Sequence, residues 1–194
     1  MKDNRDALNY GEMRIPRLFR KLFFPTLLGL LSGVLLNLAD GIFVGRGVGS
    51  DALAAINIAA PMFQVAAGIA LMFGSGVSVV AAIHLSKGNL KAANINVTQA
   101  FTMGLVLMGL VVVAINVFPR QAVALLGCSD KLYPMVHDYL LGVSPCLLFF
   151  VVELVGLFVI RLDGSPQYAM MLNVVAALVN IALDWLFVFP LGMG

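Results

Sequence analysis

The sequence has 194 residues, of which 61% are hydrophobic and 11% are charged. Water-soluble globular domains of ordinary composition do not approach these values, so the composition excludes that class of protein. The formal net charge of +2 comes from Lys and Arg residues in the loops and the tail. The sequence lacks a basic patch with interleaved aromatic residues, so it gives no indication of nucleic-acid binding. The apolar runs are long and continuous instead of alternating like barrel strands, so we predict an all-α integral membrane protein.

The order of polar and apolar stretches predicts two parts of the chain. Residues 1–21 form a polar lead-in that becomes amphipathic, which we expect on the cytoplasmic side, and residues 22–194 form a transmembrane domain. Runs of about 20 apolar residues are long enough to cross the hydrocarbon layer as helices. They predict five membrane spans, at about 22–45, 53–85, 97–118, 133–160 and 167–190.

The first span contains a carboxylate, Asp40, in an otherwise apolar stretch. An ionised carboxylate costs about 3 kcal/mol on insertion at this depth, so a chain that keeps one usually points it at a cavity or a partner. Gly29, Gly33 and Asn37 precede it at helical spacing on the same face. A functional Asp40 is favoured over a residue that only packs helices or lies near the interface. Pro25 falls in the first predicted turns, where it either starts the helix or marks a bend.

The second span carries a stripe of polar and small residues that includes Asn57 and Gln64. Such a stripe is more often an interhelical contact than a substrate path, so these two residues are only possible cavity-lining positions. Pro61 lies inside the same predicted helix. Because a proline within a helix frees a carbonyl and kinks the axis, Pro61 is a hinge candidate together with Pro25.

The third span is predicted to end at Pro119, and the fourth carries Pro145 and a second carboxylate, Glu153. Arg161 follows Glu153 closely, so we interpret Glu153 as a residue near the membrane surface. Cys128 and the other cysteine of the chain, in the fourth span, have no Cys-x-x-Cys or Cys/His spacing. No metal site is predicted from them.

The fifth span places Asn173, Asn180 and Asp184 within a narrow arc of one helix face. Most Lys and Arg residues fall on the side of the amino-terminal tail, so the positive-inside rule puts the N-terminus in the cytoplasm. With five spans, Asp40 and Asp184 each lie near the end of an outward-running helix. We therefore expect the two carboxylates at a similar depth, where they could meet.

Several short motifs together resemble a known family. They are Pro25-Thr-Leu-Leu-Gly, Leu-Ala-Asp40-Gly-Ile-Phe-Val-Gly45, the stretch from Ala54-Ala55 to Ala60-Pro61, Arg161-Leu-Asp-Gly-Ser-Pro166 and Asn180-Ile-Ala-Leu-Asp184. In this order they resemble multidrug and toxic compound extrusion (MATE) transporters over nearly the whole chain after the tail. The resemblance implies part of a twelve-helix protein with two six-helix lobes. The chain would be an amino-terminal lobe that ends before its sixth helix, and function would need the missing carboxy-terminal lobe.

The resemblance also implies a mechanism. It is strongest to the branch of the DNA-damage-inducible F proteins, in which matching residues form a cation site; here these are Asp40, Asp184 and Asn180. The implied activity is antiport in the cytoplasmic membrane, exchanging a proton or a sodium ion for an organic, often cationic, drug, without a further cofactor. The residues alone point to the same site, because two carboxylates in a poorly solvated place cannot both ionise cheaply and one would hold a proton. Possible cavity-lining residues are Asn37, Asn57, Gln64 and Asn173.

Three alternatives stay open. An intramembrane aspartyl protease also uses two aspartates on separate spans, but the Gly-x-Gly-Asp pattern that such enzymes show is absent, as is His-Glu-x-x-His, so no catalytic residue is assigned. A lipid-linked oligosaccharide flippase of the same superfamily would favour Arg or Lys within the spans, where this chain has Asp, Asn and Gln. The third alternative is a truncated membrane fragment that does not transport.

Overall fold

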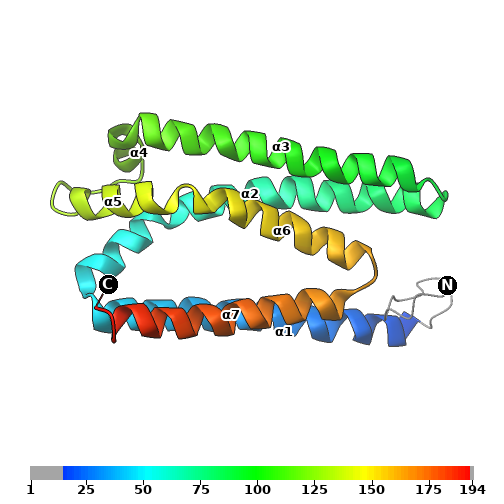
Figure 1. The fold of residues 1–194 in the computed structure, drawn as a ribbon, viewed down its shortest axis with the longest axis horizontal. Coiled ribbons are helices and arrows are strands. Elements are labelled where there is room, and N and C mark those ends of the chain that lie inside the picture. The colour runs from blue at the N-terminus through cyan, green and yellow to red at the C-terminus, as the bar shows by residue number, and fades with distance from the viewer. Residues whose placement is uncertain (1–14, 193–194) are drawn as a thin grey trace. The chain divides into compact units, whose positions relative to one another are not determined.

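The computed structural model describes residues 15–192, and every regular element within that range is a helix (Figure 1). The helices are α1 (Ile15–Gly47), α2 (Ser50–Ser86), α3 (Leu90–Val117), α4 (Pro119–Leu125), α5 (Tyr133–Val143), α6 (Cys146–Leu162) and α7 (Pro166–Val188). The first fourteen residues of the predicted amphipathic segment 1–21 lie outside the described residues. The remainder of that segment forms the first turns of α1.

Four of the described helices, α1, α2, α3 and α7, are long and apolar enough to cross a membrane. The number becomes five if α5 and α6, which meet at a bend of 52°, together form one span. The predicted all-α membrane fold is confirmed. The individual span limits and the division of the chain at residue 22 stay predictions.

The chain folds as two compact units, which are described separately. One unit joins residues 1–50 to residues 160–194 and contains α1 and α7, here called the α1–α7 pair. The other unit, residues 51–159, contains α2 to α5 and nearly all of α6, here called the α2–α6 bundle.

In the α1–α7 pair the two helices run parallel and pack along their length (Figure 1). A side chain built on Gly29 would lie 3.5 Å from Nδ2 of Asn173, so the backbones approach closely at this point. Near the other end Gly47 faces Val188, and the ring of Phe43 packs edge-on against that of Phe189 with centroids 5.9 Å apart. Small residues on α1 therefore set the spacing of the pair, as they do in many membrane helix contacts.

The α2–α6 bundle has an apolar core in which alanines predominate on α2. Ala55, Ala59, Ala66 and Ala70 recur at helical spacing on its buried face. They pack with larger buried side chains from the other helices, namely Met108, Ile115, Val123, Val136, Leu140, Leu147, Val151 and Val155. Gly74 receives the ring of Phe158 in the same manner. Small residues on one helix and large ones on its neighbours let the helices of this bundle approach closely.

The fourth predicted span consists of two helices, because the chain breaks between α5 and α6 at Ser144 and Pro145. Pro145 has no N–H to donate to the preceding turn. Ser144 is fully buried, and its hydroxyl donates to the Leu141 carbonyl and accepts a 2.9 Å hydrogen bond from Asn116 of α3. These bonds satisfy the polar groups that the break leaves in the apolar bundle.

The prolines differ in part from their predicted roles. Pro25 is buried inside α1, which begins at Ile15, so its interpretation as a helix-starting residue is wrong. Pro61 lies inside α2 as predicted, and α2 bends in its amino-terminal part (Figure 1). A hinge motion at either proline stays a prediction. Pro119 does not simply end a helix but occupies the first turn of the short helix α4, a position that suits its missing N–H.

Candidate functional site

The parallel packing of α1 against α7 brings together three polar residues that lie far apart in the sequence. They are Asp40 on α1 and Asn180 and Asp184 on α7, the last two separated by one helical turn. Asn180 donates hydrogen bonds from its amide nitrogen to Oδ1 of Asp40, at 3.2 Å, and to Oδ2 of Asp184, at 2.9 Å. The amide orientation is assigned from these partners, because the opposite one would set its oxygen against two carboxyl oxygens.

The carboxyl groups of Asp40 and Asp184 lie close to each other, because both contact the same amide. Two neighbouring carboxyl groups in a poorly solvated place cannot both ionise cheaply, so such a pair favours a state in which one of them holds a proton. Both residues are half-buried, while Asn180 is exposed. The arrangement is thus a pair of carboxyl groups that can share one proton, with one amide that donates a hydrogen bond to each of them.

The α1–α7 pair also carries an apolar and aromatic surface, and none of the three polar residues lines it. It forms a hollow of about 550 Å³. Its lining residues are Phe43, Leu178, Ile181, Ala182, Trp185 and Leu186. Trp185 directly follows Asp184 in the chain, so its indole ring projects about 100° around α7 from the carboxyl group. Aromatic faces attract organic cations through both apolar contact and the ring quadrupole.

The four possible cavity-lining residues are not brought to one place. Asn37 and Asn173 lie in the α1–α7 pair, and each donates to a carbonyl one turn earlier on its own helix, at 2.9 and 3.2 Å. Asn57 does the same on α2, at 2.8 Å, and Gln64 is an exposed residue of that helix. Local bonding of this kind satisfies an amide in an apolar environment without a ligand. A cavity-lining role for these residues stays a prediction.

Sequence reasoning missed two features. One is the aromatic hollow on the α1–α7 pair, for which the sequence offered a signal in Phe43 and Trp185, two aromatic residues within predicted spans. The other is the hydrogen bond between Asn116 and Ser144, for which only the Ser-Pro dipeptide gave a hint. No group of three or more His, Cys, Asp or Glu side chains that could hold a metal ion occurs within residues 15–192.

Comparison with known proteins places this geometry in a family. The family model MatE matches residues 25–186, which includes all three residues of the polar cluster. The chain belongs to the MATE family. This family consists of membrane transporters and not of enzymes, as predicted, and the protease alternative is wrong.

Two curated relatives show how the family varies. A FAD transporter of Shewanella oneidensis is 28% identical over 192 residues, which are 99% of this chain and 42% of the relative. The multidrug export protein MepA of Staphylococcus aureus is 25% identical over 170 residues, covering 85% of this chain and 37% of that protein. The chain therefore spans about two fifths of the length of the curated relatives it matches.

Solved structures agree with the fold. The structure of a multidrug resistance MATE family transporter of the MOP superfamily, in an outward-facing conformation, superimposes with a TM-score of 0.81 at 25% identity. The match covers 91% of this chain and 39% of that one. The described helices thus correspond to roughly half of a MATE transporter, as the sequence predicted.

Proposed function

We propose that this chain forms the ion-coupling part of an antiporter that exports organic, often cationic, compounds across the cytoplasmic membrane, with the proton as the coupling ion. Asp40, Asp184 and Asn180 are the proposed coupling site. The observation that carries the proposal is the carboxyl pair between α1 and α7, held by one amide. A pair of this kind can load a proton from one side of the membrane and release it to the other, and an organic cation can compete with the proton for the same carboxylates.

The proton is favoured because the site contains two neighbouring carboxyl groups. Such groups cannot both ionise cheaply in a poorly solvated place, so the pair can bind and release one proton. Sodium is the alternative ion, with oxygen ligands from the same three residues and from Asn37, which lies on α1 as well.

The proton gradient supplies enough energy for this task. One proton that crosses about 100 mV releases about 2.3 kcal/mol, and one unit of pH difference adds about 1.4 kcal/mol. The sum of about 3.7 kcal/mol corresponds to roughly 500-fold accumulation of a neutral solute at one-to-one coupling. The proposed mechanism therefore needs no second energy source.

The substrate class has two candidates. An organic cation suits the carboxyl pair and the aromatic hollow, and it agrees with the resemblance to the branch of the DNA-damage-inducible F proteins and with the multidrug export protein MepA. An anionic dinucleotide is the second candidate, because the similarity to the FAD transporter extends over 99% of the chain. The cation is favoured, since the polar side chains of the site include two carboxyl groups and no Lys or Arg.

Transport in reconstituted vesicles tests the proposal. The assay uses the complete gene product that contains these residues, including any second lobe. The protein is placed in proteoliposomes under an imposed pH gradient without sodium, and the side that corresponds to the cytoplasm is the side of the N-terminus. We expect gradient-driven movement of ethidium, and no such movement of FAD. Strict sodium dependence would reverse the assignment of the ion. Movement of FAD alone would reverse the substrate class, and movement of neither compound while a lipid-linked oligosaccharide crosses would favour the flippase alternative.

A further inference from the structure

We propose that the first turns of α1 bind the headgroup of an anionic phospholipid. The site is a surface hollow of about 660 Å³, here called the basic hollow. Its lining residues are Pro16, Arg17, Arg20, Lys21 and Phe24. The inference rests on α1 being a membrane span and is independent of the proposed coupling site, because that site lies toward the opposite end of the same helix.

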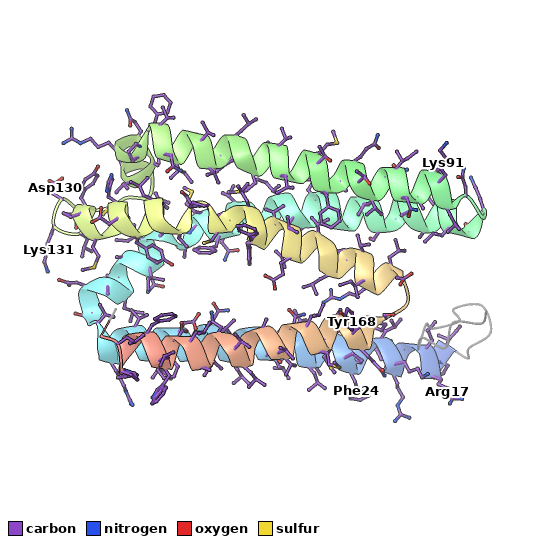
Figure 2. All side chains as sticks on the ribbon, in the orientation of Figure 1. Arg17, Phe24, Lys91, Asp130, Lys131 and Tyr168 are labelled. Carbon is purple, nitrogen blue, oxygen red and sulfur yellow. The ribbon has the colours of Figure 1, made fainter. Side chains whose placement is uncertain are left out.

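Helical spacing gathers the three cations of the basic hollow on one face. Arg17, Arg20, Lys21 and Phe24 follow one another at i, i+3, i+4 and i+7, which places their side chains one above the other. All four are exposed, and Arg17 and Phe24 both project outward from the first turns of α1 (Figure 2). Within residues 15–192 no ion pair joins any of the three cations to a carboxylate. The three cations together form a positively charged face on the first turns of α1.

The length of α1 fixes the depth of these cations. At 1.5 Å per residue α1 is about 50 Å long, whereas the hydrocarbon layer is only about 30 Å thick. The stretch of α1 between Lys21 and Asp40 carries no formal charge and is about 27 Å long. It therefore fills most of the hydrocarbon layer, which sets Lys21 at its edge and Arg17 about one turn farther out. The phosphates of lipid headgroups lie in the region just outside the hydrocarbon layer, at the depth of these cations.

Three phenylalanines give the same turns an apolar surface. The rings of Phe19 and Phe23 are stacked with centroids 5.2 Å apart, and the ring of Phe24 meets that of Phe23 edge-on at 5.6 Å. All three side chains are between 45% and 60% exposed. Phe24 lines the basic hollow itself, so an acyl chain of a lipid bound through its phosphate would contact this ring and bury it.

These features together favour a lipid over a free anion. Arginine binds a phosphate through two parallel N–H donors, so Arg17 and Arg20 suit a phosphodiester or phosphomonoester group. A free phosphate would satisfy the cations but would leave the ring of Phe24 exposed. Arginine donors at headgroup depth, with an aromatic ring about one turn deeper in the membrane, match an anionic glycerophospholipid.

The turn between α2 and α3 provides a matched control. Lys87 and Lys91 are also exposed cations in the described part of the chain, and by the positive-inside rule they face the same side of the membrane as α1's first turns. Lys91, however, lines a hollow with polar and aliphatic side chains and no aromatic ring. Removing two charges here tests whether lipid binding depends on the basic hollow or only on total charge.

Native mass spectrometry of the purified complete gene product provides the test. We titrate phosphatidylglycerol and phosphatidylcholine into the wild type, R17Q/R20Q and K87Q/K91Q, after checking that all three elute alike in size-exclusion chromatography. The wild type should retain phosphatidylglycerol in preference to phosphatidylcholine. R17Q/R20Q should retain at least about 10-fold less phosphatidylglycerol, since each cation near an anionic lipid contributes about a fivefold change in binding. K87Q/K91Q should retain as much as the wild type.

Three results would overturn the inference. Equal retention of the two lipids by the wild type would mean that the protein does not select a lipid by its headgroup charge. An equal loss in R17Q/R20Q and K87Q/K91Q would mean that only total charge matters. Displacement of bound phosphatidylglycerol by excess inorganic phosphate would identify the ligand as a small anion. None of these measurements involves transport, so the proposed function can fail without affecting this inference, and the reverse also holds.

Discussion

The α1–α7 pair and the α2–α6 bundle use their buried faces differently. Only 6% of the most apolar window of α1, and the same share in α7, is buried within the described structure, compared with 33% for α2 and 22% for α3. The pair nevertheless holds the two carboxyl groups and their shared amide, whereas the core of the bundle is almost entirely apolar. The polar groups of the candidate site thus lie in the unit with few buried residues, whereas the closely packed unit has an apolar core.

This difference predicts two classes of variants. A change at the carboxyl pair should affect ion coupling and leave the fold intact, because few buried contacts depend on it. A change in the bundle core should affect stability first, because close-packed interiors tolerate little change in volume. The variants below are ordered by the size of the effect that we expect.

Asp40→Asn and Asp184→Asn should each abolish export by the complete gene product while leaving membrane insertion and abundance near normal. Asn keeps the size and most of the hydrogen bonding of Asp but cannot carry the coupling proton. If the carboxyl groups were structural, neutralising one should be tolerated, because an amide is easier to bury than a carboxylate. The measurement is ethidium efflux together with immunoblotting of membranes. Wild-type efflux in either variant would remove that carboxyl group from the coupling site.

Asn180→Ala should reduce export strongly, by at least about 10-fold, because two hydrogen bonds to charged or proton-sharing groups are lost at once. Asn173→Ala is the matched variant on the same helix. Within residues 15–192 the hydrogen bond of its amide goes to the Ala169 carbonyl, so we expect export near the wild-type rate. The comparison is made by initial rates of efflux in vesicles with equal amounts of protein. An equal loss of efflux in the two variants would show that removing any amide side chain from α7 impairs export, and that Asn180 has no special role.

The sequence predicted that Asp40 and Asp184 lie close together, because their position follows from simple geometry. Two helices that run in the same direction, each with an aspartate near its outer end, place those aspartates at one depth, and the helical spacing of Asn180 and Asp184 puts both on one face. Predicting that Asp40 and Asp184 lie at a similar depth required no knowledge of side-chain packing. It required only the number of spans and the direction of each.

Packing details could not be predicted in the same way. The insertion of the Phe158 ring against Gly74 and the break at Ser144 depend on which helices meet and at what height. The sequence of either partner alone does not contain that information. Pro25 illustrates the same limit, because its role depended on where α1 begins, and the apolar period did not extend clearly into the charged turns before it.

Gly74→Ala should destabilise the α2–α6 bundle by about 1 to 3 kcal/mol, the usual cost of overpacking a core. A Cβ at this position would lie 2.5 Å from Cδ2 of Phe158. Gly76→Ala is the control, since its Cβ would meet no atom within 4 Å. Alanine should there stabilise the helix by up to about 1 kcal/mol. Thermal unfolding in detergent measures both, and a lower melting temperature for Gly76→Ala than for Gly74→Ala would contradict the described packing.

Ser144→Ala should cost about 1 kcal/mol, somewhat less than Gly74→Ala, because it removes the hydroxyl that accepts from Asn116 at the break between α5 and α6. Asn116→Leu should have a similar cost. The double variant should cost clearly less than the sum, since the single variants each leave one polar group unpaired. Additive losses in the melting temperature would mean that the two side chains do not act as a pair.

Glu153→Gln should have the smallest effect, with export reduced far less than by either aspartate variant. Glu153 is exposed on α6 in the α2–α6 bundle, so its carboxylate has no described role in the core. Exposed substitutions away from special features usually change stability by less than about 0.5 kcal/mol. Efflux assays identical to those for Asp40→Asn measure the result. A loss as complete as in that variant would move the ion pathway toward α6, and would show that chemistry is not confined to the α1–α7 pair.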